Sequence, residues 1–141
     1  MLFTLTYVSF ETRPISPSGL EVLIRQATRD NARDGITGVL LYTDGYFVQR
    51  LEGSREAAMA LFGRIRLDDR HEVLMITDVK PIAARTFDGW GMALLDARAF
   101  DGGIPEQQEV RSLLASLPET VRVHPEAVDE VAAVLRAVLV A

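Results

Sequence analysis

Three residues of this chain carry hydrogen-bonding side chains on faces that the sequence pattern predicts to be buried: Tyr7, Asn31 and Gln49. Leaving such a group unpaired costs about 1–3 kcal/mol. Two amides and a phenol could together bind the polar edge of one flat ligand. Each also has a simpler explanation: a glutamine that reaches water at a sheet edge, an asparagine that caps a helix, or a core tyrosine bonded to a backbone carbonyl.

Two alternating segments place the phenol and one of the amides. Residues 2–10 alternate as a strand, with Tyr7 on the more apolar face. Residues 46–53 alternate in the same way and place Gln49 on the face of Phe47 and Leu51. Both side chains are therefore expected on core faces of strands.

The second amide falls at the end of a predicted helix. Ser16 suits the N-cap of this helix and Pro17 its first position. Its buried stripe is Leu20, Leu23, Ile24 and Ala27. One further turn along this stripe reaches Asn31. Gly35 is better suited than Asn31 to end the helix, which leaves the Asn31 side chain available for another role.

The remaining segments complete an α+β fold. We predict a strand over 36–42, an Asp-Gly hairpin turn at 43–45, a second helix capped by Ser54, a strand over 71–79, a short helical turn over 82–85 and a last strand over 88–95. The order β-α-β-β-α-β-β indicates a ferredoxin-like, five-stranded mixed sheet with two helices on one face. Amphipathic helices over 105–117 and 125–140 are expected to cover the opposite face.

Composition limits the classes of function. The 141 residues are 48% hydrophobic and 25% charged, which is typical of one soluble globular domain. The absence of cysteine excludes disulfides, thiolate catalysis and cysteinyl–flavin adducts, and we predict no metal site. The net charge of −5 without a basic cluster argues against nucleic acid. Neither a signal peptide nor an apolar run of membrane-spanning length is evident, so we expect a cytoplasmic protein with no membrane contact.

An ordered set of short motifs resembles the BLUF domains, blue-light sensors that use FAD. The motifs are Tyr7-Val8-Ser9, Asn31-Ala32-Arg33, Ile36-Thr37-Gly38, Phe47-Val48-Gln49-Arg50-Leu51-Glu52-Gly53, Asp68-Asp69-Arg70-His71, Arg85-Thr86-Phe87 and Trp90-Gly91-Met92. The resemblance covers residues from about 2 to 96. It implies a photoreceptor that binds FAD non-covalently.

The resemblance also implies roles for individual residues. Tyr7 would be the photo-oxidisable electron donor, and Gln49 the amide that hydrogen-bonds the flavin ring and rearranges. Trp90 and Met92, expected on one face of the last strand, would carry the signal from Gln49. Gly91 departs from the family pattern, in which a residue with a side chain is usual, so which of its two neighbours lies beside Gln49 stays open.

Further residues are implied in cofactor binding. Asn31 would hold the carbonyl and imide edge of the isoalloxazine ring, and Asp68 would orient Arg70 toward the flavin. Local cations for the pyrophosphate would come from Arg33, Arg66 and Arg70, each of which could instead be a solvated surface arginine. The full cofactor-binding set is Ile24, Asn31, Arg33, Gln49, Phe62, Asp68, Arg70 and His71.

We expect residues 1–98 to form the sensor domain and residues 99–141 a helical extension. Such a chain would be no enzyme; it would self-associate and signal to a partner protein. One alternative is a small ferredoxin-like enzyme of the acylphosphatase type, which would bind phosphate with Arg33 and Asn31 and leave Tyr7 and Gln49 unused. The other is a colourless regulatory ligand-binding module. A yellow purified protein with flavin absorption would exclude both.

Overall fold

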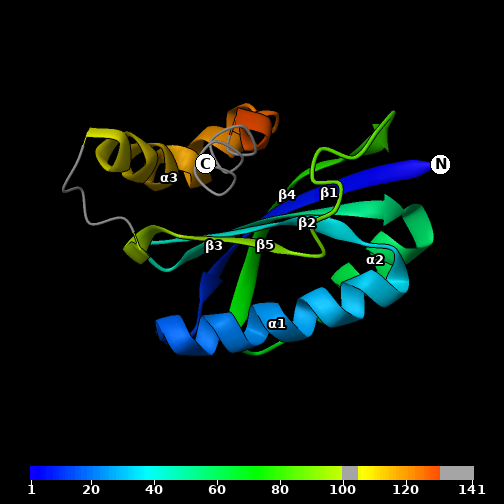
Figure 1. Ribbon diagram of the computed structural model, residues 1–141, viewed down its shortest axis with the longest axis horizontal. Helices are drawn as coiled ribbons and strands as arrows, with labels where there is room; N and C mark the ends of the chain where they lie inside the picture. The colour runs from blue at the N-terminus through cyan, green and yellow to red at the C-terminus, as the bar shows by residue number, and fades with distance from the viewer. Residues whose placement is uncertain (100–104, 131–141) are drawn as a thin grey trace.

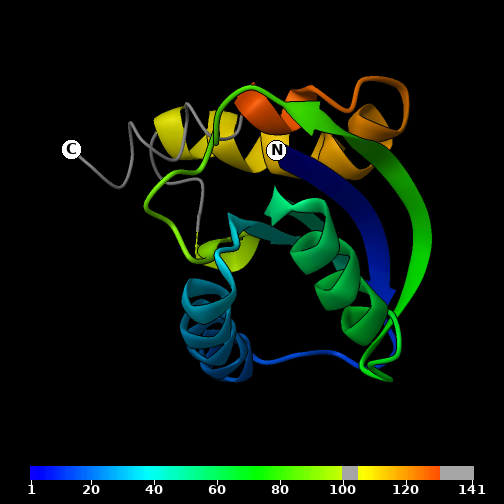
Figure 2. The ribbon, with the colours of Figure 1, turned by 90° about the vertical axis from the view of Figure 1, so that its right-hand side faces the viewer.

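The computed structural model describes residues 1–99 and 105–130 of the chain. A five-stranded mixed sheet in the order β4-β1-β3-β2-β5 lies between two helices on one face and a third helix on the other (Figure 1, Figure 2). The strands are β1 (Leu2–Glu11), β2 (Thr37–Thr43), β3 (Tyr46–Ser54), β4 (His71–Ile82) and β5 (Ala93–Asp96). The helices are α1 (Pro17–Asp34), α2 (Arg55–Ile65), the short η1 (Ala97–Ala99) and α3 (Pro105–Val123). The predicted ferredoxin-like α+β fold is confirmed.

Both helices on the first face begin at the predicted caps, and α1 also ends at the predicted glycine. The Ser16 hydroxyl accepts a hydrogen bond from the Gly19 amide at 3.0 Å, and α1 ends at Gly35 in the left-handed conformation with φ 69°. The Ser54 hydroxyl caps α2 in the same way through the Ala57 amide at 3.1 Å. Each cap satisfies a backbone donor that would otherwise lack a partner.

Strand pairing brings two of the predicted site residues together. The hairpin turn between β2 and β3 has positive φ at Asp44 (48°) and Gly45 (84°), which an Asp-Gly pair tolerates. Strand β3 is then antiparallel to β1 as well, and the register places Tyr7 directly opposite Gln49. The two side chains therefore project from neighbouring strands onto the same face of the sheet.

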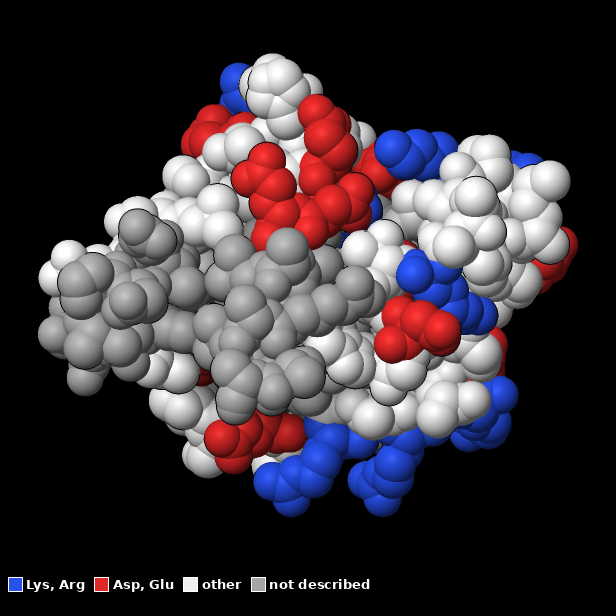
Figure 3. Space-filling model, turned by 45° about the horizontal axis from the view of Figure 1, so that its top comes forward, with Lys and Arg blue, Asp and Glu red and all other residues white. Residues whose placement is uncertain are grey.

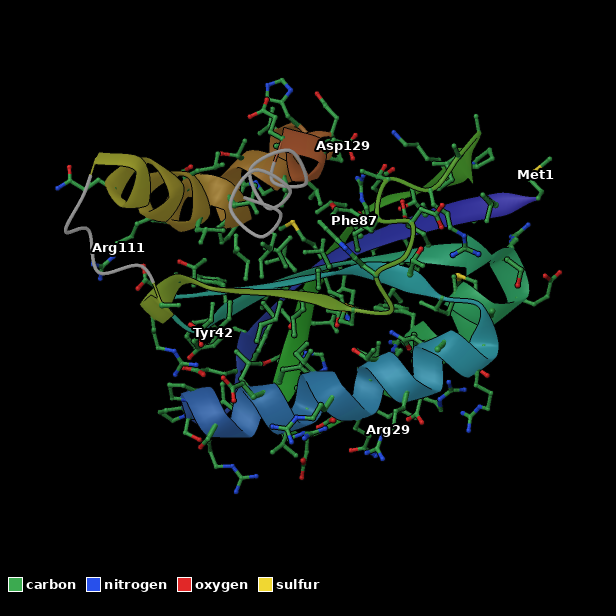
Figure 4. The ribbon with its side chains drawn as sticks, viewed as in Figure 1. Met1, Arg29, Tyr42, Phe87, Arg111 and Asp129 are labelled. Atoms are coloured by element: carbon green, nitrogen blue, oxygen red, sulfur yellow. The ribbon has the colours of Figure 1, made fainter. Side chains whose placement is uncertain are left out.

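Alternation along the strands divides the core into two clusters. The cluster under α1 and α2 includes Leu5, Tyr7, Leu20, Ile36, Phe47, Leu51 and Phe62. The cluster under α3 includes Val8, Val39, Leu41, Val48, Phe87, Leu95, Leu114, Leu117 and Val121. Figure 4 shows this division, with Tyr42 between the sheet and α1 and Phe87 on the side of α3.

Between β4 and β5, the predicted elements differ from the structure in three respects. Strand β4 continues through Pro81 to Ile82. It is an edge strand, where a residue without an N–H is tolerated. Residues 83–85 form bends and an irregular residue instead of a helical turn, and β5 begins at Ala93 instead of residue 88. Residues 83–92 form the intervening loop. Its backbone is held by hydrogen bonds to side chains of other elements and not by continuous pairing with a neighbouring strand.

Helix α3 runs past the predicted end at residue 117 and contains Pro118. Leu114, Leu117 and Val121 are fully buried or nearly so, and they continue one apolar stripe across the proline. Burial of this stripe on the sheet outweighs the loss of one helical hydrogen bond. For the described residues 105–130, the prediction that the C-terminal region covers the opposite face is confirmed.

The second predicted C-terminal helix begins as a helical stretch at residues 127–130, and its remainder lies outside the described residues. None of the described helices is both long and apolar enough to cross a bilayer.

On the face seen in Figure 3, the described Lys and Arg side chains lie in separate groups. The division into residues 1–98 and 99–141 stays a prediction, and the core cluster under α3 draws side chains from both parts.

Candidate functional site

A cavity of about 510 Å³ opens between α1, α2 and the sheet. Its apolar walls are Leu23, Ile24 and Ala27 of α1 together with Leu61 and Ile65 of α2. Its floor is formed by Tyr7, Leu40, Phe47 and Gln49. Polar residues at its rim and ends are Arg13, Gln26, Asp30, Asn31, Arg64, Asp68, Arg70 and His71. A concave apolar slot with a few convergent polar groups is the usual form of a cofactor site.

At the floor of the cavity, the Tyr7 hydroxyl donates a hydrogen bond to Oε1 of Gln49. Both residues are buried, with 2% and 7% of their surface exposed. The other end of the amide, Nε2 of Gln49, points to Sδ of Met92 at 3.5 Å. A thioether sulfur is a weak acceptor, so the oxygen end of the amide is held much more firmly than its nitrogen end.

The Tyr7 ring packs beside two other rings, those of Phe62 and His71. It is 5.3 Å from the Phe62 ring and 6.1 Å from the His71 ring, measured between centroids. Burial raises the pKa of the Tyr7 phenol far above its ordinary value, and the negative charge of Asp68 acts in the same direction. Tyr7 therefore stays protonated, and a proton must leave with any electron that it gives up.

Asn31 is buried, and its side chain reaches the loop before β5. Its Nδ2 donates to the backbone carbonyl of Gly91 at 2.8 Å, and the capping position belongs to Gly35. A Cβ on Gly91 would lie 3.1 Å from the backbone oxygen of Thr28 in α1. The departure from the family pattern at Gly91 thus allows the loop to approach α1 closely enough for this hydrogen bond.

Trp90 and Met92 lie on opposite sides of the sheet, so the prediction that they share one face is wrong. Trp90 packs against the cluster under α3, with its ring 6.0 Å from that of Phe87. Met92 belongs to the cluster under α1 and α2 and contacts Gln49. Strand alternation fails here because the segment is a loop whose backbone is held at Gly91.

His71 forms a fixed part of the cavity wall. Its Nε2 lies 2.7 Å from the carbonyl oxygen of Ile65, and its Nδ1 lies 2.7 Å from the Ser9 hydroxyl. Because a carbonyl only accepts hydrogen bonds, Nε2 must carry the proton. The ring is thereby held between α2 and β1.

The Asp68–Arg70 pair occupies the rim next to His71. Both the backbone N–H and Nε of Arg70 donate to Oδ1 of Asp68 at 2.9 Å. The hydrogen bond from the Arg70 side chain is the main cause that lowers the pKa of Asp68 from 3.8 to about 2. The carboxylate therefore stays ionised and fixes the guanidinium at the mouth of the cavity.

The cations near the cavity differ in part from those expected. Arg33 and Arg66 are exposed and do not line the cavity, and Arg33 pairs with Asp34. Arg13 and Arg64 line it instead. Helical spacing could have indicated Arg64, which follows the wall residue Leu61 by three positions. No periodic signal indicates Arg13, which lies in the loop after β1.

Two buried charges on the far side of β3 are not among the predicted site residues. Arg50 and Glu52 are 3% and 0% exposed. Glu52 accepts hydrogen bonds from the backbone amides of Thr86 at 2.7 Å and Phe87 at 2.9 Å. It also accepts one from the Thr37 hydroxyl at 3.0 Å. This carboxylate therefore anchors the loop that leads to Met92.

The residues around the cavity fit FAD. Its apolar walls suit the two faces of a planar ring, while Gln49 and Asn31 provide hydrogen-bonding groups for the polar edge of that ring. Arg13, Arg64 and Arg70 bring positive charge to the rim, where the phosphates of a longer cofactor would lie.

Fold and cavity together define a ferredoxin-like domain with a cavity between two helices and the sheet that fits a flat cofactor. The family model for BLUF, described as sensors of blue-light using FAD, matches residues 2–93. The chain belongs to the BLUF family. The predicted family and its cofactor, FAD, are thereby confirmed.

The chain spans only a small part of the length of the curated relatives that it matches. The photoactivated adenylate cyclase subunit beta of Euglena longa is 40% identical over 114 residues, which are 81% of this chain and 13% of that protein. Among solved structures, BlrB, a BLUF protein in its dark state, has a TM-score of 0.74 and 36% identity. That match covers 97% of this chain and 96% of BlrB. A bacterial light-regulated adenylyl cyclase has a TM-score of 0.76 and 30% identity, with 89% of this chain and 36% of that chain covered.

Proposed function

We propose that Tyr7 and Gln49 carry a blue-light photocycle on a non-covalently bound FAD. The observation that supports this assignment is the hydrogen bond from the Tyr7 hydroxyl to Oε1 of Gln49 at the floor of the cavity. The chain contains no cysteine that could form a covalent adduct with the flavin. We infer that light acts instead through electron transfer and a change of hydrogen bonds.

When bound, FAD supplies the absorption of blue light and accepts an electron and a proton. Tyr7 is the donor of both, because its phenol is buried and protonated. The proton leaves the Tyr7 oxygen toward Oε1 of Gln49, the group to which it is already hydrogen-bonded. Return of the electron and the proton restores Tyr7 and leaves the amide of Gln49 in a changed arrangement.

The amide of Gln49 is suited to a two-state switch because its two ends have unequal partners. Rotation or tautomerisation of the amide changes what it presents to Tyr7 and to Met92. A net hydrogen bond is worth about 0.5–1.5 kcal/mol, so exchanging one or two shifts a two-state equilibrium roughly 3- to 100-fold. Such a change is sufficient for signalling and too small to unfold the domain.

Several residues hold the cofactor in this proposal. Asn31 provides its free amide oxygen to the imide edge of the ring, while its Nδ2 remains bonded to Gly91. Arg70, oriented by Asp68, lies at the mouth with Arg13 and contacts the outer part of the cofactor. The walls, including Ile24, enclose the faces of the ring. Phe62, predicted as a cofactor contact, does not line the cavity and packs against Tyr7 instead.

The variant Gln49→Leu tests the assignment. Leucine fills much of the same space without an amide, so the purified protein should retain FAD and lose the light-induced red shift of the flavin absorption. Gln26→Leu is a matched control, because Gln26 also lines the cavity but lies on α1. It should keep the full shift. A complete and reversible shift in Gln49→Leu would contradict the role of Gln49, and a colourless wild-type protein would favour the colourless regulatory module.

We also propose that the chain signals to a partner and associates with itself. Leu74, Ile76 and Val79 on edge strand β4 are each about half exposed, which supports a contact made through this strand. Light scattering on dark and illuminated samples tests this part. A mass of one chain under both conditions would contradict self-association.

A further inference from the structure

Gln49 and Arg50 are neighbours in β3 whose side chains point to opposite faces of the sheet. Gln49 lines the cavity, whereas Arg50 makes its contacts on the side of α3. Only 3% of the Arg50 surface is exposed. A buried guanidinium needs several partners, because removing its charge from water is costly.

Arg50 meets this requirement through four contacts to other parts of the chain. Its Nε donates to the Thr6 hydroxyl of β1 at 2.8 Å, and Nη2 donates to Oδ2 of Asp78 in β4 at 3.0 Å. Its Nη1 donates to Oδ1 of Asp129 at 2.6 Å, and Nη2 also approaches the carbonyl oxygen of Pro125 at 3.2 Å. These five residues form the Arg50 cluster, which joins three strands to residues 124–130, the C-terminal segment. Figure 4 shows Asp129 on this segment, above the sheet and away from α1.

The two carboxylates of the Arg50 cluster differ in exposure. The side chain of Asp78 is 7% exposed and also has Lys80 at 3.9 Å, whereas that of Asp129 is 50% exposed. If β3 moves, Asp129 can exchange its contact for water at little cost, but Asp78 cannot. Because the guanidinium is planar and rigid, it does not keep both of these contacts when β3 moves. A displacement of β3 therefore weakens the contacts to the C-terminal segment first.

We propose that Arg50 is the positioning residue that couples the Gln49 amide to the C-terminal segment. In the dark, the Arg50 cluster holds this segment on the sheet face opposite the cofactor. In the light, rearrangement at Gln49 shifts β3 and loosens the contacts of Arg50 to Asp129 and Pro125. This inference rests on the proposed function, and it identifies the segment as the part of the chain that presents the signal.

Hydrogen exchange on the full-length, FAD-loaded protein tests this coupling. The amides of Ala127 and Asp129 bond to carbonyls within the segment at 3.0 and 2.9 Å, so they report its local opening. Blue light should accelerate their exchange about two- to fivefold, the effect expected from weakening a half-exposed ion pair. The absorption spectrum of the same sample reports the photocycle.

Two variants separate coupling from simple support. Asp129→Asn removes the exposed partner without leaving Asp78 unpaired, whereas Arg50→Ala would leave a buried charge alone and endanger folding. Exchange in the segment of Asp129→Asn should already be fast in the dark and should respond little to light. Glu130→Gln removes the same charge from the next, exposed residue and should behave as wild type.

The outcomes separate this inference from the proposed function. A normal red shift with no light-dependent exchange in the segment would overturn the coupling and leave the photocycle intact. The same holds if Asp129→Asn keeps the full light-dependent difference. Loss of the red shift in the wild type would overturn the proposed function itself, and the inference with it.

Discussion

On the face of α1 and α2, the sheet borders an open cavity, and the buried amide of Gln49 is bonded to one phenol and one thioether sulfur. On the face of α3, the sheet is covered, and the buried charges of Arg50 and Glu52 are bonded to hydroxyls, carboxylates and backbone groups. Both sets of side chains come from one strand. The difference indicates that one side of β3 can rearrange easily, whereas the other side is joined to neighbouring elements by several hydrogen bonds.

The largest effect is expected from Tyr7→Phe on the cavity face. The variant should retain FAD and lose the photocycle, because phenylalanine cannot donate an electron together with a hydroxyl proton. The stability lost with one hydrogen bond should be only about 1 kcal/mol. Flash photolysis and the light-minus-dark absorption spectrum measure the outcome.

Tyr42→Phe is the matched control, since the Tyr42 hydroxyl donates to Glu11 at 2.6 Å and does not line the cavity. It should photocycle normally. Normal photocycling in Tyr7→Phe would show that another aromatic residue donates the electron. The photochemistry would then no longer distinguish the cavity face of the sheet from the covered face.

On the covered face, Glu52→Ala should reduce the free energy of unfolding by about 3 kcal/mol. The substitution removes the acceptor of two backbone amides and one hydroxyl, and each buried donor without a partner costs about 1–3 kcal/mol. Urea denaturation measures this loss. Glu72→Ala, an exposed position in β4, should change stability by less than about 0.5 kcal/mol. Equal values for the two variants would show that burial of Glu52 contributes nothing to stability.

Asn31→Ala should weaken FAD binding roughly tenfold, the effect of about 1.4 kcal/mol. The variant loses both the amide that faces the cavity and the hydrogen bond to Gly91. Fluorescence titration of the apoprotein with FAD measures the dissociation constant. Ser18→Ala, at an exposed position of the same helix that does not line the cavity, serves as control and should leave the dissociation constant unchanged. Unchanged affinity in Asn31→Ala would restrict Asn31 to holding the loop before β5.

The smallest effect concerns acid and the Asp68–Arg70 pair. The pKa of Asp68 is lowered to about 2 in the folded protein, so the pair stabilises the fold above the unfolded pKa of 3.8. Its contribution is constant near neutral pH and disappears as the pH falls from about 4 to 2. Because Arg70 is half exposed, the free energy of unfolding of Asp68→Asn should differ from that of the wild type by only tenths of a kcal/mol. A difference in the free energy of unfolding that grows as the pH falls would contradict the predicted direction of the effect.

Much of the fold could be predicted from local signals. Ser16, Gly35 and Ser54 mark helix ends through their own capping chemistry, and the Asp44-Gly45 pair tolerates the positive φ of the hairpin. Alternation in β3 placed Gln49 on the face under α1 and α2. These features depend on a few neighbouring residues, so the sequence contains the necessary information.

The loop before β5 shows what local pattern could not predict. Residues 88–92 read as an alternating strand, but the backbone there bonds to Asn31 and the preceding loop bonds to Glu52. Both partners lie more than thirty residues earlier in the chain. The resulting loop puts Trp90 and Met92 on opposite sides of the sheet, which no periodicity within the segment indicates.

The sequence by itself determined the order of elements, the hydrogen-bonding groups of the cavity floor and, through its motifs, the BLUF family. Only the tertiary structure decided which cations line the cavity and that Arg50 and Glu52 are buried. From the strand pattern alone, these two charged residues would be expected on a face exposed to solvent. Alternation separates the two faces of a strand but does not show what covers either face. Glu52 is bonded to the loop before β5, and Arg50 is bonded to Pro125 and Asp129. The chain brings these partners to the sheet from more than thirty residues away.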